Sequence, residues 1–291
     1  MSDKSQLEFT GERFTPECVR EMSYEHWHRY AWAAEVVSGK RVLDAACGEG
    51  YGSRLLSAHA SHVTGLDISE QAVAHARDRY PAENLAFECG DASRLPFEDA
   101  SFEVVVSFET LEHLEQQDRL LAEFRRVLRP DGFLLISSPD RKTYSDERGY
   151  DNPFHVRELY RDELEVLIGR HFPVHRLWGQ KLMFVSALWQ LEDGSGVQWL
   201  LDDDGRVQAS PRPGYQPLYF LAAAAADAAC LPSLPAHSLY GDREESVYSH
   251  YNDEVSKHIR AGTLLAERDA EIRQLRAQLA QPWWRRMFGR S

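Results

Sequence analysis

The chain has 291 residues, of which 43% are hydrophobic and 11% aromatic, so it is long and apolar enough for a globular domain with appendages. Its 33 basic and 46 acidic residues give a net charge of −13, which argues against a generally cationic, nucleic-acid-binding surface. The four cysteines form no C-x-x-C pair, residues 1–12 are polar, and no apolar run reaches the about 18 residues of a spanning helix, so we expect a cytoplasmic protein with free thiols.

The first half of the chain predicts an alternation of strands and helices, which is typical of a parallel sheet with crossover helices. A polar arm over 1–20 precedes a predicted helix over 21–38, in which Tyr24, Trp27 and Ala31 share an apolar face. Strands are predicted to start at Val42 and to cover 62–66, 85–88, 102–107 and 133–137, with a tight turn at 129–132. Helices are predicted from Ser53, over 70–79 with Ser69 as N-cap, and along the apolar face of Leu120, Phe124, Val127 and Leu128.

The second half predicts an antiparallel end of the same sheet. A polar loop over 139–158 and a helix over 160–170 lead to strand-like segments at 173–178, 182–189 and 217–224, with a hairpin near 197–208. We therefore predict an α/β fold with a Rossmann-like, seven-stranded mixed sheet, helices on both faces and a β insertion near 188–215. The heptad spacing of Leu265, Ile272 and Leu279 predicts a long C-terminal helix with a short coiled-coil seam. The expected domains are an arm and cap helix (1–38), a central domain (39–235) and a helical tail (240–291).

The most distinctive segment is the glycine-rich turn that follows the first strand. Gly48 and Gly50 stand where the strand passes into a helix, so the backbone can approach a ligand and offer its amide groups. The spacing differs from the G-x-G-x-x-G of a dinucleotide site and from a phosphate loop, and the turn has no lysine. Its two acids, Asp44 and Glu49, favour a ligand with a cationic amine or sulfonium.

The order D-x-x-C-G-x-G-x-G after a hydrophobic strand resembles the first motif of class I S-adenosylmethionine-dependent methyltransferases. The resemblance implies S-adenosyl-L-methionine as cofactor, with Asp67 on the ribose hydroxyls and Asp91 beside the adenine. Acids that follow successive parallel strands meet at one edge of a sheet, where such folds bind their ligands. The expected cofactor-binding residues are Asp44, Ala45, Gly48, Gly50, Asp67, Ile68, Asp91, Ala92 and Phe108.

Two histidines are candidates for a general base. The segment S-F-E-x-x-E-H over 107–113 resembles the ubiquinone-biosynthesis-like branch of the methyltransferases, and its Glu109 and His113 stand four residues apart, so the carboxylate can orient the imidazole. His155, in the N-P-F-H-V-R segment of the polar loop, resembles an acceptor-site residue of the same branch and is the alternative base. The expected acceptor-binding residues are Tyr24, His28, Tyr30, Tyr144, Asn152 and Arg157.

The flanking segments suggest the acceptor. The arm G-E-R-F-T-P-E, the helix Y-E-H-W-H-R-Y and the C-terminal helix are similar to those of methyltransferases associated with bacterial surface-polysaccharide assembly. This resemblance implies O-methylation of a sugar hydroxyl in a surface glycan of the lipopolysaccharide O-antigen type. A quinone or other small-metabolite acceptor remains an alternative, and so does a noncatalytic scaffold.

The sequence also gives expectations about partners and metals. We expect a glycan or small-molecule acceptor and no nucleic acid. The W-W-R-R-M-F segment at 283–288 favours a peripheral contact with the inner membrane or with a glycan-assembly partner, and the heptad seam leaves a homo-oligomer open. We expect no catalytic metal, because the sequence has no H-E-x-x-H motif and no acid cluster with metal-ligand spacing.

Overall fold

The computed structural model describes Thr15 and residues 21–188, 197–203 and 206–280. Its internal contacts divide the chain into two units, Met1–Tyr240 and Gly241–Ser291. The rest of the polar arm and the aromatic and basic tail at 283–288 lie outside the described residues, so the expectations for those two segments stay predictions.

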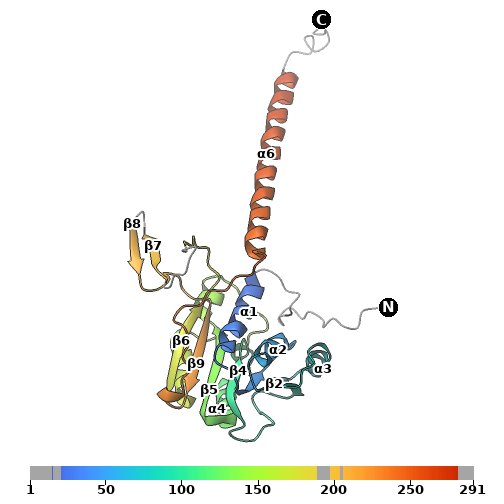
Figure 1. Ribbon diagram of the computed structural model, residues 1–291. Coiled ribbons are helices and arrows are strands. Elements are labelled where there is room, and N and C mark those ends of the chain that lie inside the picture. Colours follow the sequence, from blue (N-terminus) through green and yellow to red (C-terminus); the bar gives the residue numbers. More distant parts are fainter. Residues whose placement is uncertain (1–14, 16–20, 189–196, 204–205, 281–291) are drawn as a thin grey trace, which may run out of the picture. The chain divides into compact units, whose positions relative to one another are not determined.

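A seven-stranded mixed sheet forms the centre of the first unit, as the sequence predicts (Figure 1). The strand order is β3-β2-β1-β4-β5-β9-β6, and every neighbouring pair is parallel except the two pairs that β9 makes. The carboxyl ends of β1–β5 therefore share an edge with the start of β9 and the end of β6. The strands are β1 (Arg41–Ala45), β2 (His62–Asp67), β3 (Leu85–Cys89), β4 (Phe102–Ser107), β5 (Leu128–Pro139), β6 (Val174–Gln180) and β9 (Tyr219–Ala225).

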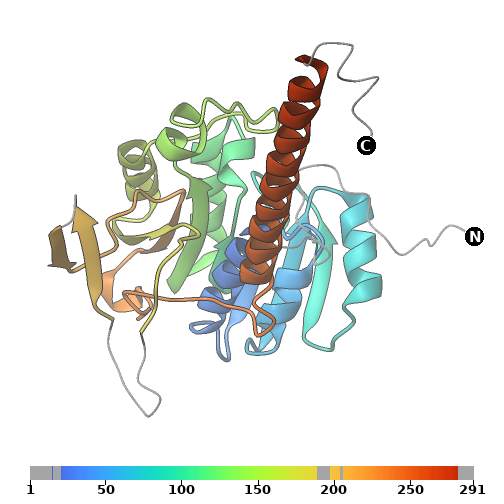
Figure 2. The ribbon, with the colours of Figure 1, turned by 90° about the horizontal axis from the view of Figure 1, so that it is seen from above.

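Helices cover both faces of this sheet (Figure 2). Alternate residues of β4 serve the two faces, because Val104 and Val106 belong to one buried cluster and Val105 to the other. The cluster around Val104 includes side chains of α1 (Glu21–Ala34) and α2 (Tyr51–Ser57), and the cluster around Val105 includes α4 (Gln117–Val127) and α5 (Arg161–His171). A run of valines thus forms a strand buried on both sides. Helix α3 (Glu70–Arg79) packs against Phe87 of β3, and the Ser69 hydroxyl caps it by accepting from the Ala72 amide at 3.2 Å, as predicted.

The structure corrects four local predictions. The first helix ends at Ala34 rather than at residue 38. The segment 129–132, predicted as a tight turn, lies inside β5, because β5 pairs with Phe102 at Leu128 and with Val104 at Phe133 and accommodates the extra residues as a bulge. Residues 181–188 follow the edge strand β6 and pair with no described strand, so the strand predicted at 182–189 is wrong for the described part. The polar loop contains a π-helical turn, η2 (Lys142–Asp146).

The remaining elements agree with the predicted β insertion and C-terminal helix. Strands β7 (Trp199–Asp203) and β8 (Arg206–Ser210) form a separate antiparallel hairpin. Short 3-10 turns are η1 (Leu111–His113) and η3 (Ala228–Cys230). In the second unit, α6 (Ser246–Ala280) is a single helix of 35 residues. Among the described residues, no helix combines the length and the apolar character needed to span a bilayer.

Candidate active site

The glycine-rich turn after β1 is tightly wound. Ala46, Gly48 and Gly50 have φ angles of 62°, 56° and 96°, the left-handed region that only glycine adopts without cost. A Cβ atom on Gly50 would lie 2.8 Å from the Ala76 Cβ, so glycine is also the only residue that lets the turn meet α3. The Cys47 amide donates to the Leu66 carbonyl at 2.9 Å, which ties the turn to the end of β2.

Asp67 at the end of β2 organises this edge of the sheet. Its two carboxylate oxygens accept from the amides of Gly48 and Ser69, each at 2.9 Å. A carboxylate oxygen can accept more than one hydrogen bond, so this anchored group can still receive hydroxyl donors from a ligand. Ile68, next in the chain, is 74% exposed, and Asp91, after β3, is exposed while its Oδ1 accepts from the Ser93 amide and hydroxyl at 2.8 Å. The ends of β2 and β3 thus present two acids around one exposed apolar side chain.

Asp44 lies in the interior instead of facing outward. It is fully buried and accepts from the Ser53 hydroxyl at 2.6 Å and the Tyr30 hydroxyl at 3.1 Å. Burial raises the pKa of Asp44 to about 7; these two hydrogen bonds oppose the shift, and the charge of Asp67 adds to it. Tyr30, predicted to bind the acceptor, is itself buried, with its ring against Gly52 and 5.2 Å from the ring of Phe108. Tyr30 and Asp44 therefore stabilise the glycine-rich turn from the interior of the domain.

Glu49, the second acid of the turn, points toward α3. It is buried and lies 2.9 Å from His75 Nε2 and 3.3 Å from Arg79 Nε, and it accepts from the Tyr80 hydroxyl at 2.9 Å. The sequence suggested that this acid could meet a cationic ligand. The structure instead shows that its charge is neutralised by the chain's own basic groups, because the left-handed turn directs the side chain away from the strand ends.

Glu109 lies two residues after the end of β4, at the same edge of the sheet. Glu109 has a φ of 50°, a strained conformation for a residue with a side chain and one that concentrates at functional sites. The Ser137 hydroxyl donates to Glu109 Oε1 at 2.6 Å, and Arg29 Nη1 lies 3.5 Å from the same oxygen. The predicted pairing with His113 is not formed, because η1 begins only at Leu111 and Glu109 turns away from it.

Arg29 of α1 is a cation buried at this edge that the sequence interpretation missed. It is 1% exposed, donates from Nε to Gln180 at 2.8 Å, and lies 4.3 Å from the centre of the Tyr219 ring. Burial works to lower the pKa of Arg29, but the charges of Glu109, Tyr219 and Glu25 outweigh it and the pKa is raised. Burial also raises the pKa of Glu25 to about 7; Arg29 opposes this shift and Glu109 reinforces it. The i, i+4 spacing of Glu25 and Arg29 within the aromatic helix was the available signal.

The two predicted base candidates lie together. The rings of His113 and His155 meet edge to face with centroids 5.1 Å apart. His113 Nδ1 is 3.0 Å from the Phe154 carbonyl oxygen, and His155 Nδ1 is 2.6 Å from Glu158 Oε1. Because a carbonyl or carboxylate oxygen can only accept, each neutral imidazole carries its proton on Nδ1 and presents an unprotonated Nε2. The fully buried Glu112 has its Oε1 3.9 Å from His113 Nε2.

Backbone contacts hold this cluster in place. The amides of Val156 and Arg157 donate to the Glu112 carbonyl at 2.8 and 3.0 Å, which fixes the polar loop on η1. The Gln117 side chain donates to the carbonyls of Leu111 and Arg157 at 2.9 and 2.8 Å. The residues that would move a proton therefore stand on a loop that is bound at several points to the sheet edge.

Of the six predicted acceptor residues, two join the histidines and four, among them the buried Tyr30, do not. Tyr144 stacks on His155 at 5.2 Å, and Asn152 donates to the Tyr144 hydroxyl at 3.3 Å. Arg157 is exposed and lies 3.8 Å from Glu163. Tyr24 and His28 both pack on the ring of Tyr240. Of the predicted acceptor residues, Tyr144 and Asn152 of the polar loop thus contact the histidine cluster.

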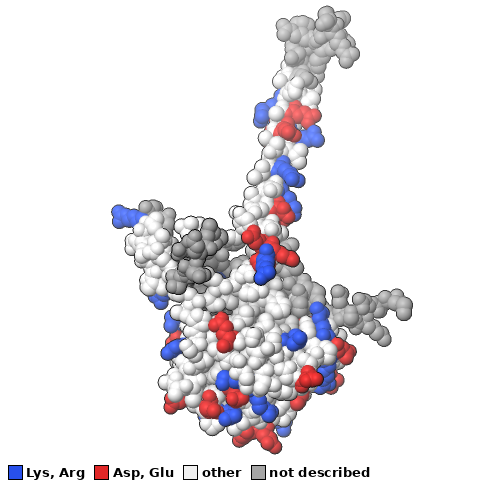
Figure 3. Space-filling view, viewed as in Figure 1, with Lys and Arg blue, Asp and Glu red and all other residues white. Residues whose placement is uncertain are grey.

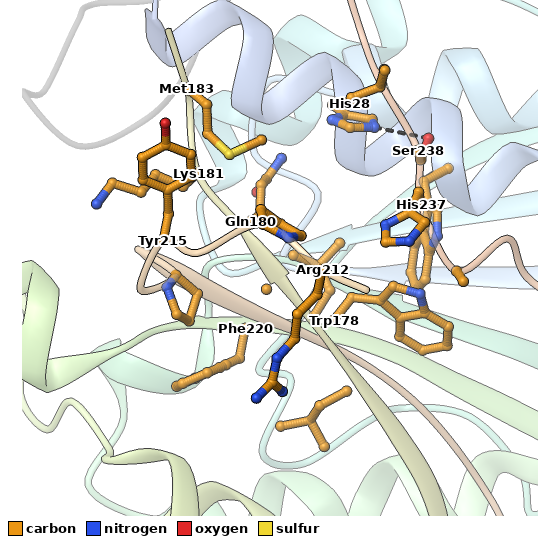
Figure 4. A pocket seen from close by; sticks show the side chains of 18 of the residues that line it. His28, Trp178, Gln180, Lys181, Met183, Arg212, Tyr215, Phe220, His237 and Ser238 are labelled. Atoms are coloured by element: carbon orange, nitrogen blue, oxygen red, sulfur yellow. Dashed lines mark hydrogen bonds between the residues drawn. The ribbon is translucent and has the colours of Figure 1, made fainter. Parts of the chain in front are cut away.

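Two cavities adjoin this edge. The smaller, about 430 Å³, is lined by His155 together with polar and charged loop residues such as Arg141, Asp151 and Arg157. The larger, about 920 Å³, follows β6 and is shown in Figure 4. Among the described residues that line it, five are basic and none is Asp or Glu, although basic and acidic side chains are interspersed on the face seen in Figure 3. The basic residues that line it are Arg29, Arg161, Arg176, Lys181 and Arg212.

Comparison with known proteins gives the class of this domain. Residues 43–136 match the methyltransferase domain family. A probable S-adenosylmethionine-dependent methyltransferase of Mycolicibacterium smegmatis is 44% identical over 167 residues, which cover 56% of this chain and 64% of that protein. The 27-O-demethylrifamycin SV methyltransferase of Amycolatopsis mediterranei is 40% identical over 158 residues, covering 50% and 56%. The PH0226 protein of Pyrococcus horikoshii has the same fold, with a TM-score of 0.52 and 21% identity over 72% of this chain and 93% of that one.

The match and the seven-stranded fold thus identify residues 43–136 as a methyltransferase domain, and the chain spans less than two thirds of the length of these curated relatives. The residues at the edge fit S-adenosylmethionine as the cofactor. Asp67 and Asp91 supply carboxylate acceptors that suit the hydroxyl and amine donors of a nucleoside, and the exposed Ile68 offers an apolar surface that suits a purine. The left-handed glycine turn brings bare backbone beside them.

Proposed function

We propose that the protein is an S-adenosylmethionine-dependent O-methyltransferase whose acceptor is a sugar hydroxyl of a bacterial surface glycan. The observation that carries the proposal is the arrangement of the sheet edge. Acids and glycines occupy the cofactor half, and the imidazoles of His113 and His155 occupy the acceptor half. S-adenosylmethionine supplies an activated methyl group, so the protein must align the acceptor and remove its proton.

The histidine cluster supports a hydroxyl acceptor. A hydroxyl must lose its proton as the new O–C bond forms, and a neutral imidazole at His113 or His155 is a base that can accept it. Phe154 and Glu158 hold the two rings in the tautomer that this role requires. Replacing His113 with Ala should therefore lower turnover while the affinity for S-adenosylmethionine is retained.

The cavities support a polar acceptor rather than a lipid quinone. The larger cavity places Trp178 and Tyr215 beside Arg212 and Lys181 (Figure 4). Flat aromatic faces and cations together suit a sugar that carries carboxylate or phosphate groups, because each aromatic ring covers apolar C–H surface while the cations pair with the anions. Arg29 connects this cavity to Glu109 and hence to the reacting edge. An anionic oligosaccharide is therefore the acceptor class that we propose.

A second candidate is a hydroxyl of a large non-carbohydrate metabolite. The Amycolatopsis relative is a 27-O-demethylrifamycin SV methyltransferase by name, and it is similar to half of this chain. If the acceptor is a quinone, the protein should transfer the methyl group to a quinone in a direct assay. If the protein is a noncatalytic scaffold, the domain should not bind S-adenosylmethionine.

A transfer assay with methyl-labelled S-adenosylmethionine separates these candidates. The panel would contain neutral oligosaccharides, uronic-acid or phosphate-bearing oligosaccharides, a rifamycin-type macrolactam, a fatty acid and a quinone. The proposal expects label in the anionic oligosaccharides, and it expects Arg212→Gln to raise KM with little change in kcat. Arg129→Gln, an exposed residue that contacts Asp131, is the matched control. Label only in the fatty acid, the quinone or the macrolactam would overturn the glycan proposal.

We also propose that the second unit serves recruitment, to a membrane-bound assembly partner or to a second copy. Leu265, Ile272 and Leu279 recur along α6 and are 67%, 45% and 64% exposed, a seam that suits a partner helix. A chain truncated after Tyr240 should keep its S-adenosylmethionine affinity but lose membrane-fraction recovery or oligomeric mass. If both properties survive truncation, the recruitment role is wrong.

A further inference from the structure

We infer that Glu112, His113 and His155 form a binding site for one divalent transition-metal cation, such as Zn²⁺ or Mn²⁺. The side chains come from positions 112–113 and 155, more than 40 residues apart, and the fold brings them to one point beside the smaller cavity, which His155 lines. One potential ligand atom from each lies within 4.8 Å of the other two. The inference rests on the proposed function only for the role of the cation, not for its binding.

The donor set matches the chemistry of such a cation. Two imidazole nitrogens and one carboxylate oxygen suit Zn²⁺, Mn²⁺ or Fe²⁺, whereas Mg²⁺ and Ca²⁺ prefer oxygen ligands throughout. Ligand atoms about 2.1 Å from one tetrahedral cation stand roughly 3.4 Å apart. Glu112 Oε1 and His113 Nε2 lie 3.9 Å apart, so they need to approach by only about half an ångström, which side-chain rotation supplies.

The surroundings orient the ligands as in established metal sites. Metal-binding histidines usually donate their other ring nitrogen to a carbonyl or carboxylate, which fixes the ring and raises its basicity. Both histidines do so here, to Phe154 at 3.0 Å and to Glu158 at 2.6 Å.

The position of the site indicates what the cation would do. His155 lines the cavity of about 430 Å³, so an acceptor hydroxyl that enters this cavity can reach a cation at the cluster. A cation there would coordinate the acceptor hydroxyl and lower its pKa, so that the proton leaves to water and the oxygen attacks the methyl carbon as the carbon–sulfur bond breaks. With the cation bound, the two Nε2 atoms act as ligands, and proton removal runs through the cation instead of through direct acceptance by histidine.

The test is calorimetric titration of the full chain, stripped with a chelator, with ZnCl₂ and separately with MnCl₂, in the absence of S-adenosylmethionine. We expect one saturable site, and we expect His155→Ala to weaken it at least 100-fold. Glu158→Gln, which leaves all three ligands in place, should weaken it about 10-fold to 100-fold, the usual effect of an outer partner. His171→Ala is the control, because His171 pairs with the exposed Asp118 away from the cluster. Circular dichroism melting confirms that each variant is folded.

The outcomes separate this inference from the proposed function. No saturable site in the wild type, or equal affinity in the wild type and in His155→Ala, overturns the metal site even if methyl transfer is observed. A metal site lost in His155→Ala and kept in His171→Ala supports it even if no acceptor of the panel is methylated. Glu112→Gln provides a second ligand variant in case His155→Ala does not fold.

Discussion

Replacing Tyr30 with Phe tests the buried hydrogen bond behind the glycine turn. The Tyr30 hydroxyl donates to Asp44 Oδ1 at 3.1 Å, and both groups are buried. The pKa of Asp44 is about 7, so this carboxyl is charged at pH 8.5 and protonated at pH 5. A hydrogen bond to a charged group contributes about 1.5–3 kcal/mol and one between neutral groups about 0.5–1.5 kcal/mol. Tyr30→Phe should therefore cost roughly 2 kcal/mol at pH 8.5 and roughly 1 kcal/mol at pH 5.

The assay is urea unfolding of both chains at the two pH values, followed by fluorescence. The sign follows from linkage: losing a donor to the charged form raises the folded-state pKa of Asp44 further, so the deficit grows as pH rises through 7. Tyr160→Phe is the matched control, because it removes a hydroxyl that donates to Asp146 at 2.7 Å where both groups are exposed. At both pH values it should cost less than Tyr30→Phe, because water replaces the lost hydrogen bond of an exposed pair. An equal cost of Tyr30→Phe at both pH values would show that the charge of Asp44 does not change between pH 5 and pH 8.5.

Three further predictions concern stability. Gly50→Ala should lower the free energy of unfolding by about 2–4 kcal/mol, because Gly50 has a φ of 96° and an added Cβ would meet Ala76. Gly39→Ala is the control and should cost only about 1–2 kcal/mol, because Gly39 has a φ of 70° but no neighbour within 4 Å of an added Cβ. Equal shifts of the melting temperature in the two variants would contradict this. Gly262→Ala, in open space on α6, should stabilise that helix by about 1 kcal/mol, seen as a higher melting temperature in circular dichroism; a lower one would mean that the helix is not formed there. Burial raises the pKa of Glu25 to about 7, so the free energy of unfolding falls as pH rises from 4.5 to 7. Glu25→Gln should reduce this loss by up to about 2 kcal/mol. An unchanged dependence of stability on pH would show that Glu25 does not titrate in this range.

The strands and helices between 41 and 139 were predictable because local signals agree with the fold. The Val104–Val106 run, the Ser69 cap and the acids at successive strand ends each have a short-range cause that the structure confirms. The bulge at 129–132 was not predictable, because its glycine and proline are equally typical of a turn and only the pairing with β4 decides between them.

The site was predictable on its cofactor side more than on its acceptor side. Asp67 could be placed because the strand that precedes it defines its position. Asp44 and Glu49 could not, since the partners that take up their side chains, Tyr30 and His75, come from other parts of the chain. The cluster of Glu112, His113 and His155 was invisible for the same reason: no linear spacing relates position 155 to positions 112–113.

The role of Asp67 is tested by calorimetric titration with S-adenosylmethionine. Asp67→Asn keeps the shape of the side chain but removes its charge and one of the acceptors for the Gly48 and Ser69 amides. The lost charge-assisted hydrogen bonds should weaken binding at least about 10-fold. Asp78→Asn, an exposed acid on α3, is the matched control and should bind as the wild type does.

The central claim is that the ends of β1, β2 and β3 hold S-adenosylmethionine, and this titration measures it directly. We expect one saturable site in the wild type and in Asp78→Asn and clearly weaker binding in Asp67→Asn. Absence of binding to the wild type at millimolar cofactor, or equal affinities in Asp67→Asn and Asp78→Asn, would contradict it.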